Sequence, residues 1–329
     1  MNTNYVCPET GEILEEQQYG LIGKNGTLYP FIAVNNEIKI PNFLIAQQQT
    51  KATKQALTMY DQKASTDIYR NFLDWLFKTF EENETSFRTN LVAKLNLQKG
   101  NRVLITACGL GDDIRPIMDA IGEQGEVYAN DLAAEMVVAS SDYLYPDQSS
   151  PKNLFYAVCD AQNLPFENDY FDAAFHFGGI NLFDNMKSAI EEMERVVKPG
   201  GRVAFGDEGV ASWLKNTEYA NIAIENNSLW ASDVPINLLP KNCIDVNLSW
   251  VLGNCFYMID FQVSETGPFM NIDVPHKGLR GGTMRTRYFG QLEGVSKESK
   301  EFVIKDAKQK GVSVHEWIEQ IINEKKQSI

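Results

Sequence analysis

Two glycines and an aspartate carry the strongest chemical signal in this chain of 329 residues. The apolar run over 103–107 leads directly into Gly109 and Gly111, and Asp131 follows twenty residues after the second glycine. Glycines at such a turn let the backbone approach a ligand, and an acid at that distance accepts hydrogen bonds from ribose hydroxyls. The spacing therefore predicts a site for a nucleoside-bearing ligand at the end of a strand.

The residues after Gly111 narrow the choice of ligand. Asp112 and Asp113 follow directly, so the third glycine of the dinucleotide fingerprint is missing. Two acids at a helix N-terminus would repel a pyrophosphate, which that end of a helix otherwise attracts. We therefore expect S-adenosylmethionine (SAM), which carries a sulfonium and no phosphate. A nicotinamide-dependent dehydrogenase is the less favoured alternative.

Two further segments end where a ligand would lie. Asp131 belongs to the sequence Ala-Asn-Asp-Leu, and besides binding ribose it could begin the helix that follows. Asp160 and Ala161 come after the next apolar run, where a carboxylate can accept a hydrogen bond from an adenine amino group. For Asp160 the alternative is a turn-forming aspartate.

The elements that must position these residues alternate along the chain. Apolar runs predict strands at 102–107, 126–130, 154–159, 171–177 and 202–207, and helical periodicity predicts helices at 112–121, 133–143 and 185–197. Pro199 and Gly200-Gly201 separate the last helix from the last strand. Such alternation is typical of an α/β fold with a Rossmann-like, mostly parallel sheet and helices on both faces.

The flanking segments have different patterns, which predict three parts. Residues 1–44 form a small β-rich leader, residues 45–210 form the ligand-binding core with helices over 45–98, and residues 211–329 form an α+β C-terminal extension. We expect a helix over 211–229, a hairpin around Gly253-Asn254, and helices over 296–309 and 313–326. Ser313 and Glu316 predict a capping box for the last helix. The extension is expected to complete the sheet and cover the substrate site.

Composition limits the classes of partner. The net charge of −14 disfavours nucleic acid, because an acidic surface repels phosphates. The five cysteines are scattered without close pairs, which favours free thiols in a reducing compartment and no metal site. No apolar run has transmembrane length, and the first residues do not resemble a secretory signal. We therefore expect a cytoplasmic protein without a membrane partner; the sequence does not indicate its oligomeric state.

Taken together, the motifs resemble those of class I SAM-dependent methyltransferases, in particular the ubiquinone/menaquinone-methyltransferase-like group. The resemblance rests on the glycine turn, Leu164-Pro-Phe, Phe171-Asp172 and the stretch from Arg195 to Arg202, and it covers about 60–210. It implies contacts to the methionine part of SAM, the ribose and the adenine. The implied cofactor-binding residues are Tyr60, Tyr69, Ala107, Gly109, Gly111, Asp131, Leu132, Met136, Asp160, Ala161 and Phe177.

The chain also departs from that family. Thr106 stands where the family has an acid that contacts the SAM amino group indirectly, and Asp112 or Asp113 could replace it. The leader resembles a degenerate form of the small zinc-ribbon-like module of tRNA-methyltransferase activators. Of the metal-binding cysteines only Cys7 is present, so no zinc is expected.

The acceptor side is less clearly marked. His176 and Asn181 follow the fourth strand as candidates for acid–base or polar contact, although His176 could equally be a buried structural residue. Gly178 would let the backbone approach the reacting methyl group. Asp207 and Glu208 end the fifth strand, where they could hold a cationic substrate, assist deprotonation or simply form a solvated turn.

A basic segment stands out in the acidic chain. It contains Arg280, Arg285 and Arg287 next to glycines, which could bind an anionic group of the substrate. The alternative is that it pairs with the acidic remainder of the protein.

These observations predict methyl transfer from SAM to a small molecule, as a step in small-molecule biosynthesis. The reaction is a direct displacement at the methyl carbon, in which alignment matters more than acid–base chemistry. RNA methylation and a non-catalytic SAM-binding or scaffold protein are the alternatives. The acceptor atom is not indicated.

Overall fold

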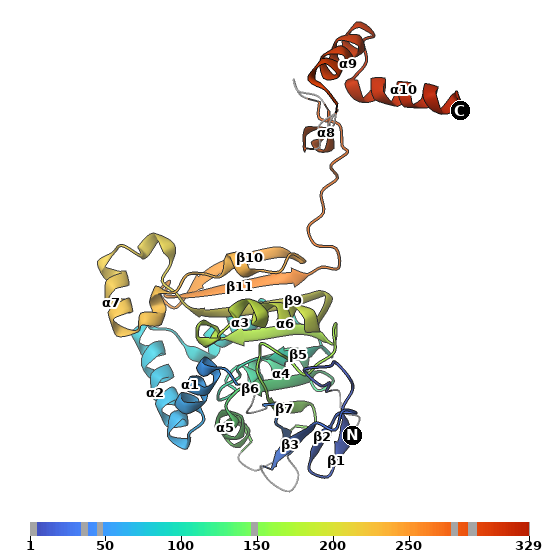
Figure 1. Cartoon of the computed structure of the whole chain (residues 1–329). Coiled ribbons are helices and arrows are strands. Elements are labelled where there is room, and N and C mark those ends of the chain that lie inside the picture. The colour runs from blue at the N-terminus through green and yellow to red at the C-terminus, as the bar shows by residue number, and fades with distance from the viewer. Residues whose placement is uncertain are drawn as a thin grey trace. The chain divides into compact units, whose positions relative to one another are not determined.

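The computed structural model describes residues 5–33, 39–44, 49–145, 151–277, 282–288 and 295–328. Residues Met1–Pro268 form one compact unit and Phe269–Ile329 form a second. The first unit contains the central sheet and the leader (Figure 1). The predicted division at 44 and 210 therefore differs from the division by contacts, because the segment 211–268 packs with the core.

The first unit is built on a sheet of seven strands. Their order is β10-β11-β9-β8-β5-β6-β7, and β11 alone runs opposite to the other six strands. The strands are β5 (Arg102–Ile105), β6 (Glu126–Asp131), β7 (Leu154–Val158), β8 (Phe171–Phe177), β9 (Val197–Glu208), β10 (Cys243–Val251) and β11 (Phe256–Val263). The mostly parallel α/β sheet predicted from the sequence is confirmed.

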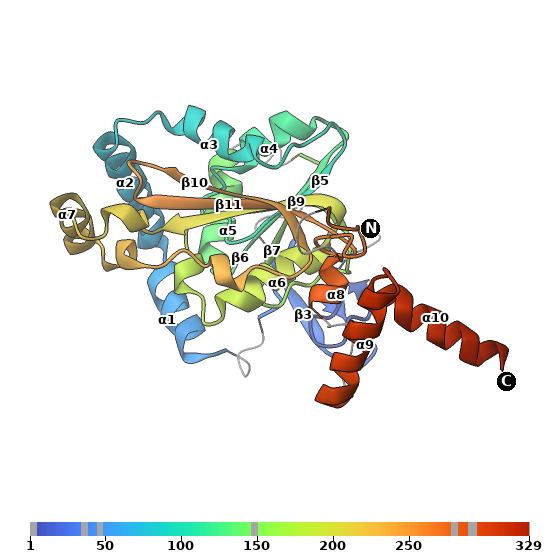
Figure 2. The same cartoon turned by 90° about the horizontal axis from the view of Figure 1, so that it is seen from above.

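Alternate residues of each strand face two separate cores. Val103 and Ile105 belong to one core, together with residues of α2 (Lys63–Thr79), α3 (Glu84–Ala93), α4 (Ile114–Ile121) and α5 (Ala134–Leu144). Leu104 belongs to the other core, with α6 (Met186–Val196) and the leader. Figure 2 shows α3 and α4 on one side of the sheet and α6 on the other. Strands buried on both faces explain the unbroken apolar runs in the sequence.

The leader forms an antiparallel sheet of its own. Its strands are β1 (Glu15–Gln17), β2 (Gly20–Ile22), β3 (Leu28–Ala33) and β4 (Lys39–Pro41). The N–H of Phe43 donates to the carbonyl of Val158 at 2.8 Å, and Asn42 forms an isolated parallel β-bridge with Val158. The leader thus covers the open edge of β7, which would otherwise present unpaired backbone groups.

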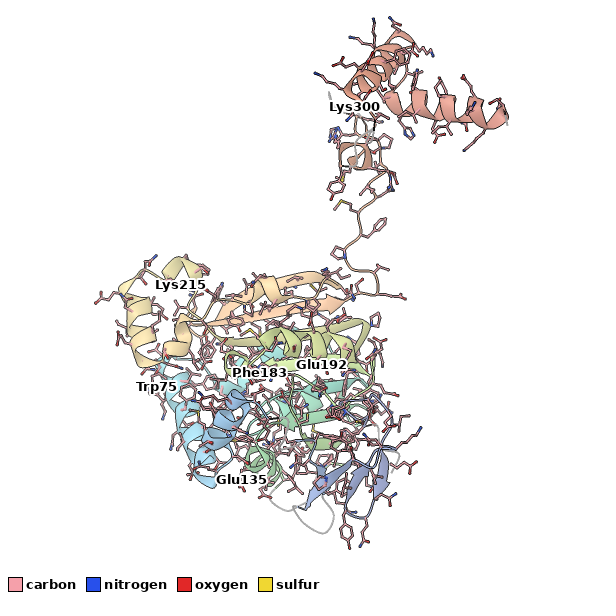
Figure 3. The ribbon with its side chains drawn as sticks, in the orientation of Figure 1. Trp75, Glu135, Phe183, Glu192, Lys215 and Lys300 are labelled. Carbon is pink, nitrogen blue, oxygen red and sulfur yellow. The ribbon has the colours of Figure 1, made fainter. Side chains whose placement is uncertain are left out.

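The segment between the leader and β5 is helical, as predicted. It contains α1 (Lys51–Tyr60), α2 and α3. Trp75 of α2 stacks on Trp230 of the short helix η4 (Ser228–Ala231), with ring centroids 6.3 Å apart. Figure 3 shows Trp75 where α2 meets the segment that carries α7 (Glu218–Asn226). This aromatic contact joins the helices before the sheet to the segment after β9.

Some predicted boundaries differ from the observed ones. The single helix expected over 211–229 is interrupted, because α7 begins only after Thr217 caps it and ends at Asn226. Strand β9 begins at Val197, earlier than predicted, since Val197 already has an extended conformation (φ −94°, ψ 132°). Gly200, at φ 88°, accommodates the turn-like backbone within this strand.

The second unit contains α8 (Met284–Tyr288), α9 (Lys297–Gln309) and α10 (Val314–Gln327). Ser313 and Glu316 form the predicted capping box, each side chain bonding the other's backbone N–H. Covering of the substrate site by residues 211–329 stays a prediction. Within the described residues, the structure has no helix long and apolar enough to cross a membrane.

Candidate cofactor and acceptor site

The order of the strands places a crevice at the carboxyl ends of β5 and β8. The chain proceeds from β5 through β6 to β7 on one side, and from β8 to β9 on the other. Open α/β sheets bind ligands where the strand order reverses in this way. A cavity of about 470 Å³ lies there, lined by residues at or just after the carboxyl ends of five strands and by helices α1 and α2.

The turn after β5 is tied to the end of β6 through Asp131. The N–H of Gly109 donates to one carboxylate oxygen of Asp131 and the N–H of Ala133 donates to the other, both at 2.9 Å. Burial raises the pKa of Asp131, and these backbone donors oppose the rise. Each oxygen has a second lone pair and Asp131 lines the cavity, so Asp131 can both hold the turn and accept hydrogen bonds from a ligand.

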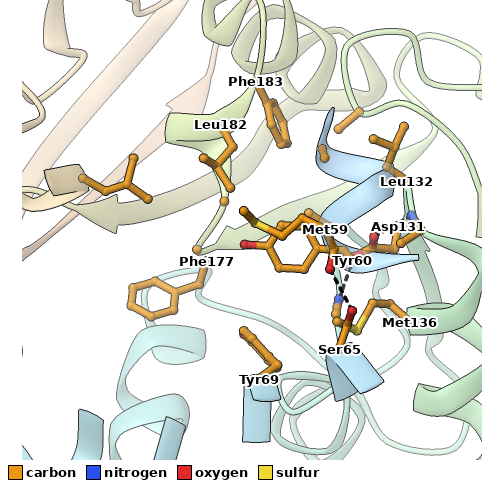
Figure 4. Close-up of a pocket in the computed structure, with 18 of the residues that line it drawn as sticks. Met59, Tyr60, Ser65, Tyr69, Asp131, Leu132, Met136, Phe177, Leu182 and Phe183 are labelled. Carbon is orange, nitrogen blue, oxygen red and sulfur yellow. Dashed lines mark hydrogen bonds between the residues drawn. The ribbon is translucent and has the colours of Figure 1, made fainter. Parts of the chain in front are cut away.

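The cavity gathers most of the cofactor-binding residues that the sequence suggested. Figure 4 shows Asp131, Leu132 and Met136 on one side of Tyr60, and Phe177 on the other. The predicted residues in the lining are Tyr60, Tyr69, Ala107, Gly109, Asp131, Leu132, Met136, Asp160, Ala161 and Phe177, together with Gly178 and Glu208 of the predicted substrate set. Their roles toward a ligand stay predictions.

Gly111 is the exception among the glycines, because it does not line the cavity in the described structure. Its φ is +78°, and a Cβ atom there would lie 2.2 Å from Oγ of Ser140. The second glycine of the motif is therefore required for packing of the turn against α5, and its predicted contact with the methionine part is not supported by its position.

We expect Gly111→Ala to lower the free energy of unfolding by about 3 kcal/mol, from the left-handed backbone and the overpacking together. Gly100→Ala is the control, since Gly100 has φ +86° but nothing within 4 Å of a Cβ atom. It should lose only about 1 kcal/mol in the same urea denaturation. Equal losses in the two variants would contradict the packing role.

Asp112 and Asp113 face two arginines instead of the ligand. Arg88 of α3 donates to Asp113 at 2.9 Å and lies 3.5 Å from Asp112, while Arg70 of α2 donates to Asp112 at 2.8 Å. Both acids are paired with arginines, which weakens the repulsion that they would exert on a pyrophosphate. Neither acid lines the cavity, whereas Arg88 does.

Arg88 is a site residue that the sequence analysis missed. Its side chain is 7% exposed and also bonds Glu84, four residues earlier on the same helix, at 2.8 Å. Burial by itself would lower the pKa of Arg88, but Asp113 and Asp112 outweigh it and raise the pKa. The spacing of Glu84 and Arg88 marks a helical ion pair, but nothing in the sequence connects it with the distant acids.

The three predicted catalytic residues lie outside the described cavity lining. His176 is fully buried with Nδ1 3.1 Å from both Oγ1 and the carbonyl of Thr106, and burial lowers its pKa. The N–H of Asn181 donates to Asp207 at 2.7 Å, and its side-chain amide donates to the carbonyl of Glu208 at 2.8 Å. Asp207 is completely buried. Their placement favours structural or positioning roles over direct catalysis.

The basic segment belongs to the second unit. Arg280 lies outside the described residues, while Arg285 and Arg287 lie in α8. Arg285 forms an ion pair with Asp273 of the same unit, at 2.5 Å, and both side chains are more than half exposed. The predicted contact of these arginines with an anionic substrate stays a prediction.

The apolar part of the lining was not singled out as a site from the sequence. Most of it comes from one face of α2, whose helical periodicity indicated only a buried surface. Phe177 and Leu182 in Figure 4 lie across Tyr60 from Asp131. The apolar lining residues of α2, η4 and β11 are Ile68, Phe72, Leu73, Leu76, Phe77, Leu229 and Phe256.

Comparison with known proteins supports a methyltransferase domain in one part of the chain. Residues 104–205 match the family model described as a methyltransferase domain. Together with the relatives below, this match supports a class I SAM-dependent methyltransferase domain over this part of the chain. The matched residues run from β5 into β9 and include the glycine turn and Asp131. The resemblance found in the sequence is thereby confirmed, except that nothing in the comparisons supports a zinc-ribbon-like leader.

Curated relatives match the same part of the chain. The ubiquinone/menaquinone biosynthesis C-methyltransferase UbiE of Burkholderia vietnamiensis is 38% identical over 161 residues, covering 49% of this chain and 63% of the relative. The protein of the same name from Burkholderia mallei is 29% identical over the same lengths. The chain thus spans less than two thirds of the curated relatives it matches, and the methyltransferase domain is their shared part.

A solved structure agrees on the fold. The Haemonchus contortus phosphoethanolamine N-methyltransferase 2, in complex with S-adenosyl-L-methionine, aligns with a TM-score of 0.52 and 14% identity. The alignment covers 69% of this chain and 63% of that one. At this identity the similarity shows the Rossmann-like methyltransferase fold alone.

Proposed function

We propose that the protein transfers a methyl group from SAM to a small-molecule acceptor by direct displacement. The observation that carries the proposal is the single cavity lining that joins Gly109, Asp131 and Asp160 to an apolar compartment. Gly109, Asp131 and Asp160 lie at the carboxyl ends of β5, β6 and β7. A nucleoside bound where the strand order reverses would contact these three strand ends in this order. The match to the methyltransferase domain begins within β5 and includes all of β6 and β7.

Each of these residues would contact a different part of SAM. Gly109 would leave room for the methionine part beside Tyr69, Asp131 would accept the ribose hydroxyls, and Asp160 would meet the adenine amino group. Bound SAM would supply an electrophilic methyl group on a sulfonium. Tyr60 and Tyr69 would close the cavity from α1 and α2, so that water is excluded and the acceptor is aligned.

The residues that line the cavity also indicate the charge and polarity of the acceptor. Among the described lining residues, Arg88 is the one cation, and carboxylates of Glu84, Asp112 and Asp113 already surround it. The apolar compartment therefore favours a largely apolar small molecule. An anionic group on the acceptor would depend on Arg280, Arg285 and Arg287, and stays a separate prediction, as does the cytoplasmic location.

Isothermal titration tests the first step. We expect S-adenosylhomocysteine and SAM to bind one site per chain, and NADH not to compete with them. Incubation with methyl-labelled SAM and a small-metabolite extract should then transfer label to a small molecule. Absence of SAM binding would contradict the proposal, and binding without any transfer would favour the non-catalytic alternative.

RNA methylation is the weaker alternative. The net charge of −14 opposes binding to a phosphate backbone. Tight, salt-dependent binding to RNA in a gel-shift titration would restore it.

A further inference from the structure

The two edges of the central sheet differ in how they are covered. The leader covers β7 through the contact of Phe43 with Val158, whereas β10 is the outermost strand on the opposite side (Figure 1). β10 forms its ladder with β11, and the backbone groups of 247–251 form no other hydrogen bond with any described residue. An uncovered edge of this kind offers a row of N–H and C=O groups to another strand.

The composition of this edge does not protect it against pairing. The segment 247–251 has the sequence Asn-Leu-Ser-Trp-Val, without a charged residue or a proline. A bulge lies just before it, between Ile244 and Asn247, where Asp245 has φ +48° and accepts a hydrogen bond from Arg202 at 2.7 Å. The bulge ends the regular edge at Asn247, because a bulge locally disrupts the ladder and bends its strand. Five residues in regular register remain.

Apolar side chains along this edge are exposed. Leu248 pairs with Ile259 and Trp250 with Tyr257, so both lie on the face of the sheet that packs against α6. Leu248 is 44% exposed. Trp213 is 64% exposed and contacts the ring of Trp250, with ring centroids 5.6 Å apart. Unpaired backbone groups and exposed apolar side chains thus occur together, as in a surface that takes up a further strand.

The segment 247–251 is complementary to itself in the antiparallel direction. A two-fold axis at Ser249 sets Leu248 of each copy opposite Trp250 of the other, on one face of the sheet. On the other face it sets Asn247 opposite Val251 and Ser249 opposite Ser249. No like charges meet in this register, and aliphatic–aromatic pairs across strands are favourable. Because both copies contribute the same segment, the contact closes as a dimer.

We propose that β10 pairs with β10 of a second copy of this chain, so that the two seven-stranded sheets join into one continuous sheet. The dimer covers the edge that the leader leaves open. In the part of the chain that the structure describes, neither Trp213 nor any residue of 247–251 lines the SAM cavity. The inference therefore does not depend on methyl transfer, and S-adenosylhomocysteine titration and dimerisation can fail separately.

Sedimentation velocity of the full chain tests the proposal. We expect a dimer with a Kd on the order of micromolar, because a short strand pair with few apolar side chains is at the small end of stable interfaces. A chain that stays monomeric up to about 100 μM would overturn the proposal, because it would lack even a weak interface of this kind.

Charge at Ser249 distinguishes this pairing from a contact elsewhere. Ser249→Lys and Ser249→Glu each set like charges opposite one another, so each variant alone should raise the dimer Kd by about 100-fold. An equimolar mixture should form a heterodimer with a Kd within about fivefold of wild type, because lysine then faces glutamate. Ile222→Lys, at a 67% exposed position of α7, is the control and should leave the Kd unchanged.

The contrary results are equally specific. A dimer that persists in both Ser249 variants would show that another surface, such as the helices of 269–329, joins the copies. Loss of the dimer without recovery in the mixture would contradict the pairing of Ser249 with itself. Both results overturn the proposal.

Hydrogen exchange of the wild-type chain gives a reading that needs no variant to fold. The backbone N–H groups of 247–251 should exchange more slowly at about 100 μM than at about 1 μM, since mass action favours the dimer. Exchange that is independent of protein concentration over this range would also overturn the proposal.

Discussion

Asp131→Ala should weaken S-adenosylhomocysteine binding by about 100-fold, the largest effect on affinity that we expect from one side chain. Two hydrogen bonds from ribose hydroxyls to a buried carboxylate would be lost, each worth about 1.5 kcal/mol or more. The turn would also lose the acceptor for the N–H of Gly109. Isothermal titration of the purified variant measures the change.

The controls separate ribose binding from support of the turn. Asp131→Asn keeps one acceptor oxygen and should lose about tenfold. Asp142→Asn removes the same charge from an exposed position of α5 and should bind like wild type. Unchanged affinity in Asp131→Ala would show that the ribose assignment is wrong, and a collapse of folding in that variant makes Asp131→Asn the deciding measurement.

Arg88→Met should lower the free energy of unfolding by about 3–5 kcal/mol, the largest stability effect that we expect. The methionine fills a similar volume, but the buried carboxylates of Asp113 and Asp112 lose their shared cation. Removing one partner of a buried ion pair leaves an uncompensated charge, which costs this amount. Urea denaturation at neutral pH gives the value.

An exposed ion pair provides the control for this variant. Lys187 and Glu191 lie 2.7 Å apart on α6 with about half of each side chain exposed, and Lys187→Ala should cost less than about 1 kcal/mol. Adding Asp113→Asn to Arg88→Met should recover part of the loss, because it removes one orphaned charge. Equal losses in the buried and exposed variants would contradict the network.

The pH dependence of Arg88→Met has a definite sign. Burial raises the pKa of Asp113, and Arg88 opposes that rise. Without Arg88 the folded protein binds the proton of Asp113 more tightly than the unfolded chain does. Stability therefore falls as the pH rises above the unfolded value of about 4, and the loss relative to wild type should be smaller in mild acid.

The cofactor-binding side of the site could be predicted from the sequence because each of its residues lies close in sequence to the end of a strand. The turn at Gly109, the acid at the end of β6 and Asp160 after β7 each follow a strand within a few residues. Parallel strands bring their carboxyl ends to one edge, so spacing along the chain predicts proximity in space. The roles of His176 and Asn181 could not be predicted in this way. Successive side chains of a strand point to opposite faces, so a shift of one residue decides whether a side chain faces the cavity or the core.

What the sequence by itself determined is the alternation of strands and helices, the mostly parallel sheet and the family of the domain. Only the tertiary structure decided which charged side chains pair with one another and what surrounds each of them. Arg88 and Asp113 are 25 residues apart, and their pairing depends on how α3 packs against α4. Likewise, the sequence shows Asp207 and Glu208 only as adjacent acids, whereas the structure gives Asp207 two backbone N–H donors and places Glu208 in the cavity lining. Charge states follow the surroundings in space, which residue types and spacing do not contain.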